Sequence, residues 1–104
     1  MLRTFRSYQL AVQFYKECRG LRAPYGLRDQ LGKAASSVAL NLAEGSGKSS
    51  KKDRLRFYEI ALGSTRECEA IMDLLEVNDT AITERLDLLA RHVFTRCRSL
   101  RDGG

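Results

Sequence analysis

Five basic residues gather within nine positions of this sequence, and their chemistry suits contact with phosphate groups. Lysine and arginine neutralise the phosphates of a nucleic-acid backbone, and the free N–H groups at the start of a helix add further donors. An exposed, solvated loop without a partner is the other interpretation of this pattern. The nucleic-acid-binding candidates are Lys48, Lys51, Lys52, Arg54 and Arg56.

The tripeptide Gly47-Lys48-Ser49 is similar to the end of a phosphate-binding nucleotide motif, but the rest of that motif is missing. The motif requires a glycine at position 42, where Leu42 stands, and a strand before the loop, where we expect a helix. We therefore do not predict a nucleoside triphosphate site here.

The side chains with catalytic or metal-binding chemistry form no recognisable group. His92 is the only histidine, and no cysteine or second histidine stands at ligand spacing on its helix face. We therefore expect no catalytic residue, no metal, no cofactor and no enzyme activity. The acidic residues of the second half lack the Glu-x-x-His pattern of di-iron bundles and predict a solvated face: Glu67, Glu69, Asp73 and Glu76.

The three cysteines, Cys18, Cys68 and Cys97, form no Cys-x-x-Cys pair, and an odd number suits no closed disulfide framework. Each falls on an apolar helix face, which favours buried reduced thiols. The N-terminus shows no signal peptide, and no stretch approaches the ~20 apolar residues of a membrane span. The sequence therefore predicts a cytoplasmic protein with no membrane partner.

The chain has 104 residues, of which 43% are hydrophobic and 30% charged, which predicts one globular domain over 1–104. Its net charge of +5 is unevenly distributed. Residues 1–56 hold 12 basic and 4 acidic residues, whereas residues 57–104 hold 6 basic and 9 acidic residues. This asymmetry favours an anionic partner for the first half of the chain.

Four segments repeat apolar residues every three or four positions, which is the period of an amphipathic helix. We expect helices over 4–19, 27–44 and 50–76, and a fourth that follows a cap at Thr80. Ser50 is the expected cap of the third helix, and Gly45-Ser46-Gly47 is expected to end the second. Short connections between such helices predict an all-α fold, an antiparallel up-down-up-down four-helix bundle.

Several positions in the second and third helices have expected structural roles. Small side chains dominate the second helix, and Gly63-Ser64 interrupts the third, so we expect the two helices to approach closely there. A polar pair, Asn41 and Glu44, is expected to hydrogen-bond backbone groups, with Glu44 anchoring a neighbouring helix start. The structural candidates are Asn41, Glu44, Gly45, Gly63 and Ser64.

Apolar residues also stand where a monomer would place polar ones. Leu55, Tyr58 and Leu62 lie at i, i+3 and i+7, away from the main apolar stripe of the third helix. Contiguous exposed apolar patches usually mark interfaces, so we predict self-association. The oligomer-interface candidates are Leu10, Phe14, Leu40, Leu55, Tyr58 and Leu62, with Leu88 in addition.

Two segments carry a resemblance to a known family. The stretch Ser37–Lys48 contains Asn-Leu-Ala-Glu-Gly at the expected end of the second helix, and Arg56–Ser64 contains a phenylalanine followed by Ala-Leu-Gly-Ser. The pair resembles the 23S rRNA intervening-sequence proteins. This chain departs from them at Ala39-Leu40, where relatives often have Pro-Ser, and at Leu62, where arginine is common.

The resemblance implies an antiparallel four-helix bundle that assembles with itself as a ring, a homopentamer in some members. Some members are encoded inside intervening sequences of ribosomal RNA genes, and distant relatives assist the reverse transcriptase of diversity-generating retroelements.

The sequence as a whole favours a non-enzymatic homo-oligomer with a basic surface that contacts RNA or an RNA–protein complex. The alternative is a protein–protein interaction scaffold with no nucleic-acid role. No aromatic stacking platform is apparent, which argues against sequence-specific readout.

Overall fold

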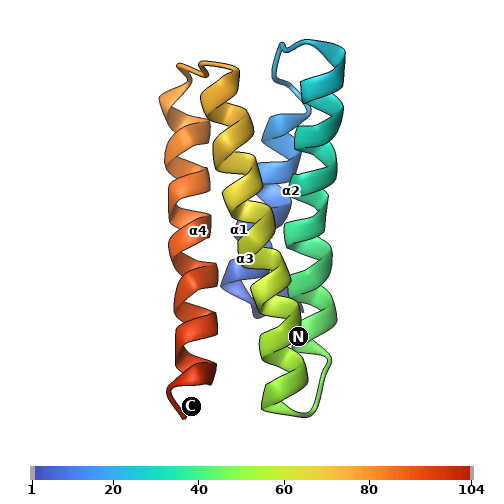
Figure 1. The fold of residues 1–104 in the computed structure, drawn as a ribbon, viewed down its shortest axis with the longest axis vertical. Helices are drawn as coiled ribbons and strands as arrows, with labels where there is room; N and C mark the ends of the chain where they lie inside the picture. Colours follow the sequence, from blue (N-terminus) through green and yellow to red (C-terminus); the bar gives the residue numbers. More distant parts are fainter. Residues whose placement is uncertain (1, 104) are drawn as a thin grey trace.

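The computed structural model describes residues 2–103 and shows an all-α protein. Figure 1 shows successive helices side by side and running in opposite directions along the long axis. Contacts between α1 and α4 close the bundle, which measures 41 × 22 × 21 Å. The predicted four-helix bundle is therefore confirmed. The elements are a 3₁₀ turn, η1 (Leu2–Thr4), followed by α1 (Arg6–Cys18), α2 (Tyr25–Ser46), α3 (Lys51–Leu74) and α4 (Thr80–Arg101).

Side-chain caps fix where α3 and α4 begin. Ser50 caps α3, as the sequence predicts, because its Oγ accepts the backbone N–H of Asp53 at 3.1 Å. The prediction of Thr80 as the cap of α4 is wrong, since Asp79 holds that position and its Oδ1 accepts the N–H groups of Ala81 and Ile82. A carboxylate is favoured there because it also interacts with the positive end of the helix dipole.

The segment Gly45-Ser46-Gly47 ends α2, as the sequence predicts, because the helix stops at Ser46 and Gly47 follows it as the C-cap. Its two glycines have different roles. Gly45 does not end α2 but is buried inside it, and a Cβ there would lie 2.6 Å from Tyr58 Cε1 and 3.1 Å from Phe57 Cβ. Gly47, the residue after α2, has a φ of −87°, so the helix ends without a left-handed glycine. A Cβ on Gly63 would meet no atom within 4 Å. Gly63 itself therefore makes no close contact, whereas α2 and α3 approach closely at Gly45 and at Ser64, whose Oγ lies 2.8 Å from that of Ser37.

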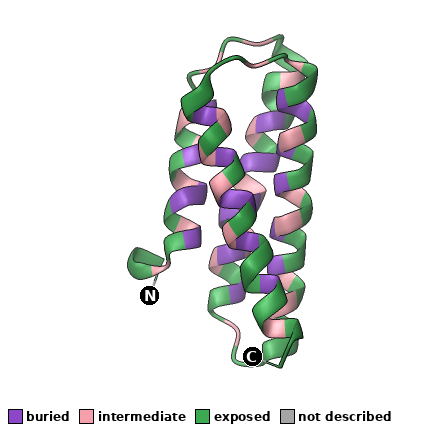
Figure 2. Cartoon of the chain, turned by 90° about the vertical axis from the view of Figure 1, so that its left-hand side faces the viewer, coloured by how far each residue is buried: buried purple, intermediate pink, exposed green. Residues whose placement is uncertain are grey.

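Buried side chains line the inner faces of all four helices (Figure 2). In α1 the buried positions follow a spacing of three and four residues, because a helix in a bundle turns one stripe toward its neighbours. Small residues dominate the buried stripe of α2, which lets α3 pack closely against it. The largest fully buried side chains are Phe14, Leu10, Leu31, Leu42, Leu89, Val38 and Val93.

Three of the predicted oligomer-interface residues belong to this core. Leu10 and Phe14 are 0% exposed and Tyr58 is 5% exposed within the single chain. Their assignment to an interface is wrong, because the apolar arc on α1 and α3 is too wide for the sequence alone to locate its centre. Leu55 and Leu62 are half-buried and also pack against the core.

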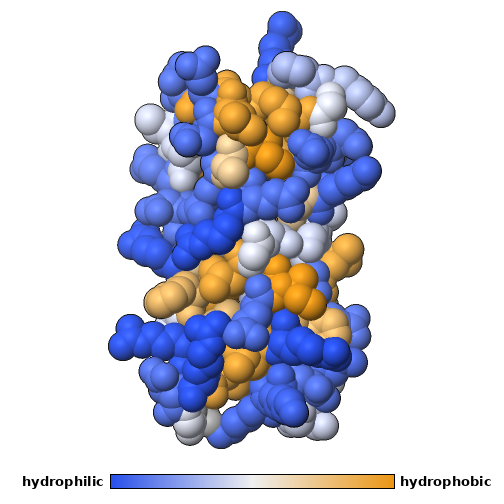
Figure 3. Space-filling model, in the orientation of Figure 1, coloured by the Kyte–Doolittle hydropathy of each residue, from blue (hydrophilic) through white to orange (hydrophobic). Residues whose placement is uncertain are grey.

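Other large apolar side chains face outward. Leu40 is 68% exposed, which leaves it as the most accessible of the predicted interface residues. Figure 3 shows apolar side chains gathered in two areas on the face formed by α3 and α4, separated by a belt of hydrophilic ones. The exposed large apolar residues on α2, α3 and α4 are Tyr25, Leu40, Ile60, Leu74 and Phe94.

Candidate nucleic-acid interface

A chain of polar side chains fixes α2 against α3 about two to three turns before the basic segment begins. The Oγ atoms of Ser37 and Ser64 are 2.8 Å apart, and either can donate to the other. Asn41 Nδ2 donates to the carbonyl of Ser37 at 2.9 Å and to its Oγ at 3.1 Å. These bonds place Asn41 and Ser64 within the α2–α3 contact.

The sequence predicts that Glu44 anchors the start of a neighbouring helix. Glu44 instead pairs with a member of the basic segment. Its Oε2 lies 3.2 Å from Lys48 Nζ, and both side chains are partly exposed. Exposed pairs of this kind contribute at most about 1 kcal/mol. The pair therefore orients Lys48 at the end of α2 without holding it away from solvent.

Phe57 brings two of the predicted basic residues together. Lys48 Nζ lies 5.2 Å from the centroid of the phenylalanine ring, and Arg56 Cζ lies 5.1 Å from it. Each cation is attracted by the negative face of the aromatic ring. The half-buried ring thus carries two positive charges next to the α2–α3 connection.

Lys51 and Lys52 occupy the first two positions of α3, where their charge is unfavourable for the helix. The N-terminus of a helix carries a partial positive charge, and a cation placed there costs about 0.3–1 kcal/mol. Asp53 offsets part of this cost. Within the described residues, neither lysine takes part in a salt bridge, and both are exposed. Both charges are therefore free to meet an anion.

Arg54 turns away from these lysines into a shallow hollow of about 290 Å³. Its Nη2 donates to the carbonyl of Lys48 at 2.9 Å, whereas its Nε is buried and has no hydrogen-bond partner among residues 2–103. Arg96 of α4 lines the same hollow, with its Cζ 5.3 Å from the ring centroid of Phe5. Two guanidinium groups therefore share one small concavity. Its other lining residues are Thr4, Phe5, Ser46 and Tyr58.

The pKa of the Tyr58 hydroxyl depends on burial and on the charges around this hollow. Burial raises the pKa of its hydroxyl, and the positive charges of Arg54 and Arg96 act in the opposite direction. Its ring packs on Phe5, with centroids 5.9 Å apart. The hydroxyl is therefore protonated at neutral pH and adds a donor beside two fixed positive charges.

The sequence does not identify Arg96 as a member of this group, because it lies 42 positions after Arg54. One signal points to it: in an antiparallel bundle the end of α4 lies beside the start of α3. The remaining first-half arginines divide between the two ends of the bundle. Arg3 and Arg6 lie near the start of α1, whereas Arg19, Arg22 and Arg28 lie at the opposite end (Figure 1).

Burial makes the three cysteine thiols less reactive as nucleophiles. Burial raises the pKa of Cys18 and of Cys68 to about 12, and burial also raises the pKa of Cys97. All three are free and buried. Because the thiolate is the reactive form, these groups are inert at neutral pH.

No group of three or more histidine, cysteine or acidic side chains within residues 2–103 is arranged to hold a metal ion. None of the four helices in that part of the chain has the length and apolar character that crossing a membrane requires.

The fold defines a class of small four-helix bundles. The chain belongs to the family of the 23S rRNA-intervening sequence protein, whose sequence profile matches residues 4–100. The resemblance of Ser37–Lys48 and Arg56–Ser64 to that family is thereby confirmed. No curated protein and no solved structure matches the chain.

Proposed function

We propose that this protein is a non-enzymatic, self-assembling bundle that binds RNA or an RNA–protein complex through the α2–α3 end. The observation that carries the proposal is the pair of unpaired lysines at the start of α3, beside the hollow that holds Arg54 and Arg96. The two lysine charges are unfavourable beside the positive end of the α3 dipole. An anionic partner bound there would offset this unfavourable energy.

The groups at this end suit phosphate rather than a carboxylate side chain. Exposed lysines act as point charges toward a backbone that passes by, and arginine recognises phosphate oxygens with its fork of donors. Arg54 Nε is a buried donor that an anion oxygen in the hollow would satisfy. Backbone contacts of this kind bind nucleic acid without reading its sequence.

Self-assembly is the second part of the proposal, and the exposed apolar residues support it. Leu40, Ile60, Leu74 and Phe94 project from three different helices. A symmetric ring, which the family resemblance implies is a homopentamer, would cover some of them. The ring would also repeat the basic end around its axis, and several weak contacts would then act together.

The free thiols suit a reducing compartment, so we extend the proposal to a cytoplasmic location. Their raised pKa values also support a protein that binds instead of catalysing, because no nucleophilic thiolate is present at neutral pH.

Binding of a fluorescent single-stranded RNA at several salt concentrations tests the RNA-binding part. The logarithm of the association constant should fall linearly with the logarithm of salt concentration. Replacing both lysines, Lys51→Gln with Lys52→Gln, should reduce the slope by about 1.4, because each lost phosphate contact on a single strand contributes ~0.7.

A matched control removes the same charge elsewhere: Lys16→Gln with Arg66→Gln, both at exposed positions of other surfaces. The control should leave the slope nearly unchanged. Equal slopes for the two double variants, or no RNA binding at low salt, would overturn the RNA-binding proposal and favour a protein-interaction scaffold.

Light scattering coupled to size exclusion tests self-assembly. The protein should elute as a multiple of its 11.7 kDa subunit mass. Leu40→Glu and Phe94→Glu should dissociate the assembly, whereas Ala70→Glu, at an exposed position without a large apolar side chain, should not. A monomer at all concentrations would refute the ring.

A further inference from the structure

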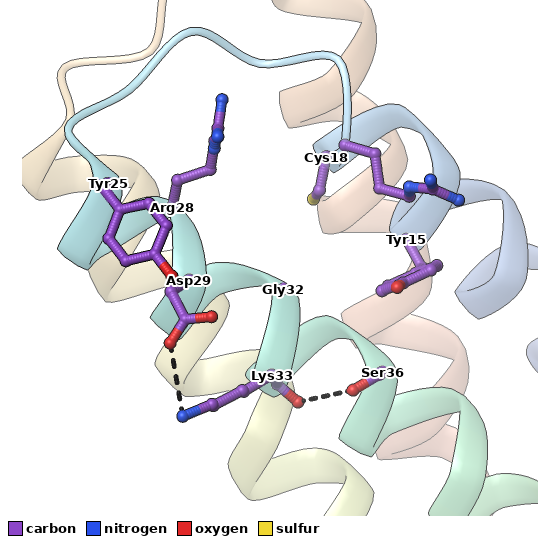
Figure 4. A pocket seen from close by; sticks show the side chains of 9 residues that line it. Tyr15, Cys18, Tyr25, Arg28, Asp29, Gly32, Lys33 and Ser36 are labelled. Atoms are coloured by element: carbon purple, nitrogen blue, oxygen red, sulfur yellow. Dashed lines mark hydrogen bonds and ion pairs between the residues drawn. The ribbon is translucent and has the colours of Figure 1, made fainter.

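A second hollow lies at the opposite end of the bundle, between the end of α1 and the first turns of α2. Its volume is about 480 Å³, within the range of small-molecule sites. Figure 4 shows Tyr15 and Cys18 of α1 on one side of it, with Tyr25 and Arg28 of α2 on the other. The other lining residues are Arg19, Asp29, Gly32, Lys33 and Ser36.

The charges around this hollow are positive and partly unmatched. Lys33 Nζ is paired with Asp29 Oδ2 at 3.3 Å, so these two charges balance each other. Arg19 and Arg28 have no salt bridge or side-chain hydrogen bond to any residue in 2–103. Two arginines without an ionic partner therefore line the hollow, and each has a fork of donors suited to phosphate oxygens.

Two aromatic rings stand at the same place. Tyr25 is 77% exposed and lies at the mouth of the hollow, where its ring packs against no other aromatic ring of the described chain. Tyr15 is half-buried and lines the wall that α1 provides. The residues are ten positions apart and belong to different helices, so only the fold brings their rings to one cavity.

Gly32 keeps the space between these groups empty. It lies inside the N-terminal half of α2, where glycine costs ~1 kcal/mol relative to alanine, and a Cβ at this position would meet no atom within 4 Å. Helix packing therefore does not require a glycine here. Figure 4 shows it between the tyrosine of α1 and the first turn of α2, facing the open volume.

We infer that this hollow binds one nucleotide unit, with its phosphate held by Arg19 and Arg28 and its base stacked on Tyr25. Every base has a flat π-face, and stacking on an aromatic side chain contributes strongly to the binding of unpaired nucleotides. The N-terminus of α2 has no side-chain cap and no acidic residue in its first turn, which further favours a negative group there.

The dimensions favour this ligand over an extended phosphopeptide. The hollow has the volume of a site for one small molecule, and its aromatic and cationic groups lie on facing walls, not along a groove. The nucleotide unit has two sources, a free mononucleotide or an unpaired nucleotide of a strand. The inference does not rest on RNA binding at the α2–α3 end, because the two sites lie at opposite ends of the bundle.

Titration of the ¹⁵N-labelled protein with AMP, adenosine and ribose 5-phosphate, followed by NMR, tests the inference. AMP should shift the amide signals of Tyr25, Arg28 and Gly32. Adenosine and ribose 5-phosphate should each bind at least about tenfold more weakly, since each lacks one of the two recognised groups. A tetranucleotide in a parallel titration separates the sources: tighter binding than AMP indicates a strand, and equal binding indicates a free nucleotide.

Two substitutions locate the ligand. Tyr25→Ala should weaken AMP binding roughly five- to a hundredfold, because it removes the stacking surface while its exposed position leaves the fold intact. Gly32→Leu should abolish binding by filling the hollow. Gly63→Leu is its matched control, because Gly63 is also a helical glycine whose Cβ would meet open space.

Three results would overturn the inference: no shifts with either AMP or the tetranucleotide, full AMP binding by folded Gly32→Leu, or unchanged AMP affinity in Tyr25→Ala. The double variant Lys51→Gln with Lys52→Gln should bind AMP as the unchanged protein does. Loss of AMP binding in that variant would place the ligand at the α2–α3 end instead. A result that contradicts AMP binding therefore does not contradict RNA binding at the α2–α3 end, and the reverse also holds.

Discussion

The two ends of α2 contain the same residue types, arranged to opposite effect. At the α2–α3 end, Gly45 has no space for a Cβ, because the Tyr58 ring fills it. At the α1–α2 end, Gly32 faces open volume beside Tyr25, whose ring is exposed. A glycine in one helix thus serves close packing at one position and leaves a cavity at the other. Composition does not distinguish the two cases.

The arginines differ in the same way. Arg54 is inserted between the helices, with Nη2 bonded to a backbone carbonyl and Nε buried. Arg28 has no such bonds and extends beside the opening of the second hollow (Figure 4). The Arg54 side chain is therefore bonded into the α2–α3 end, whereas the Arg28 side chain is exposed at the α1–α2 end. This contrast is measurable in stability as well as in binding.

The largest expected effect contrasts the two glycines directly. Gly45→Ala should lower the free energy of unfolding by about 1–3 kcal/mol, because the Tyr58 ring and the Phe57 Cβ must move away from α2. Gly32→Ala should raise it by up to about 1 kcal/mol, because alanine is the better helix former and meets no atom. Urea denaturation measures both. Equal changes in the free energy of unfolding for the two variants would contradict the difference in packing between Gly45 and Gly32.

The next effect concerns charge at helix ends. Replacing both Lys51 and Lys52 with glutamine should stabilise the protein by about 1 kcal/mol at low salt, because each charge opposes the dipole of α3. Lys16→Gln should destabilise it slightly, because Lys16 lies in the last turn of α1, where a cation is favourable. Thermal melts at low and high salt provide the measurement. A gain that persists in high salt would not be electrostatic.

Ion pairs between helices should contribute less to the free energy of unfolding than the glycine and lysine substitutions change it. At the α1–α2 end, Arg85 Nε lies 3.1 Å from Glu17 Oε1, and both side chains are about one-quarter to one-third exposed. A double-mutant cycle with Glu17→Gln and Arg85→Gln should give a coupling of about 0.5–1 kcal/mol. The more exposed pair at the other end, Glu59 with Arg101, should give a smaller coupling. The reverse order would mean that solvent exposure does not control their strength.

The smallest effect is a pH dependence from His92. Burial lowers its pKa, and the positive charges of Arg6, Arg96 and Arg91 lower it further. The unfolded chain therefore binds the proton at higher pH than the folded chain, so stability is full above pH 6.5 and falls as the pH drops through 6.5 toward the folded-state pKa.

NMR titration of this single histidine measures the folded-state pKa directly, and Arg96→Gln should raise it. Phosphate held beside Arg96 in the α2–α3 hollow should raise it as well, because an anion offsets the charge that lowers it. A pKa of His92 that does not respond to Arg96→Gln would contradict the assignment of its cause.

Much of the fold follows from local patterns. The three- and four-residue spacing of apolar positions predicts four helices, and Ser50 predicts where α3 begins because its hydroxyl satisfies a free N–H group. Boundaries are less certain where two residues can both cap, as at Asp79 and Thr80. Asp79 takes the position because its carboxylate accepts two N–H groups at once.

The candidate site was predictable only in part. Lys48 to Arg56 are adjacent in the chain, so their presence at one helix junction follows from the sequence. Arg96 joins Arg54 only because α4 ends beside the start of α3. Tyr15 and Tyr25 likewise meet only when α1 and α2 are packed together. Such groupings depend on helix pairing, which local spacing does not encode.

The sequence by itself determined the number of helices, their approximate ends and the family. Only the tertiary structure decided which side of each helix faces inward. Leu10, Phe14 and Tyr58 lie in the core while Leu40 and Ile60 face solvent, although all five are large and apolar. The physical reason is that an apolar arc wider than half a helix permits several rotations about the helix axis, and the mutual packing of four helices selects one of them.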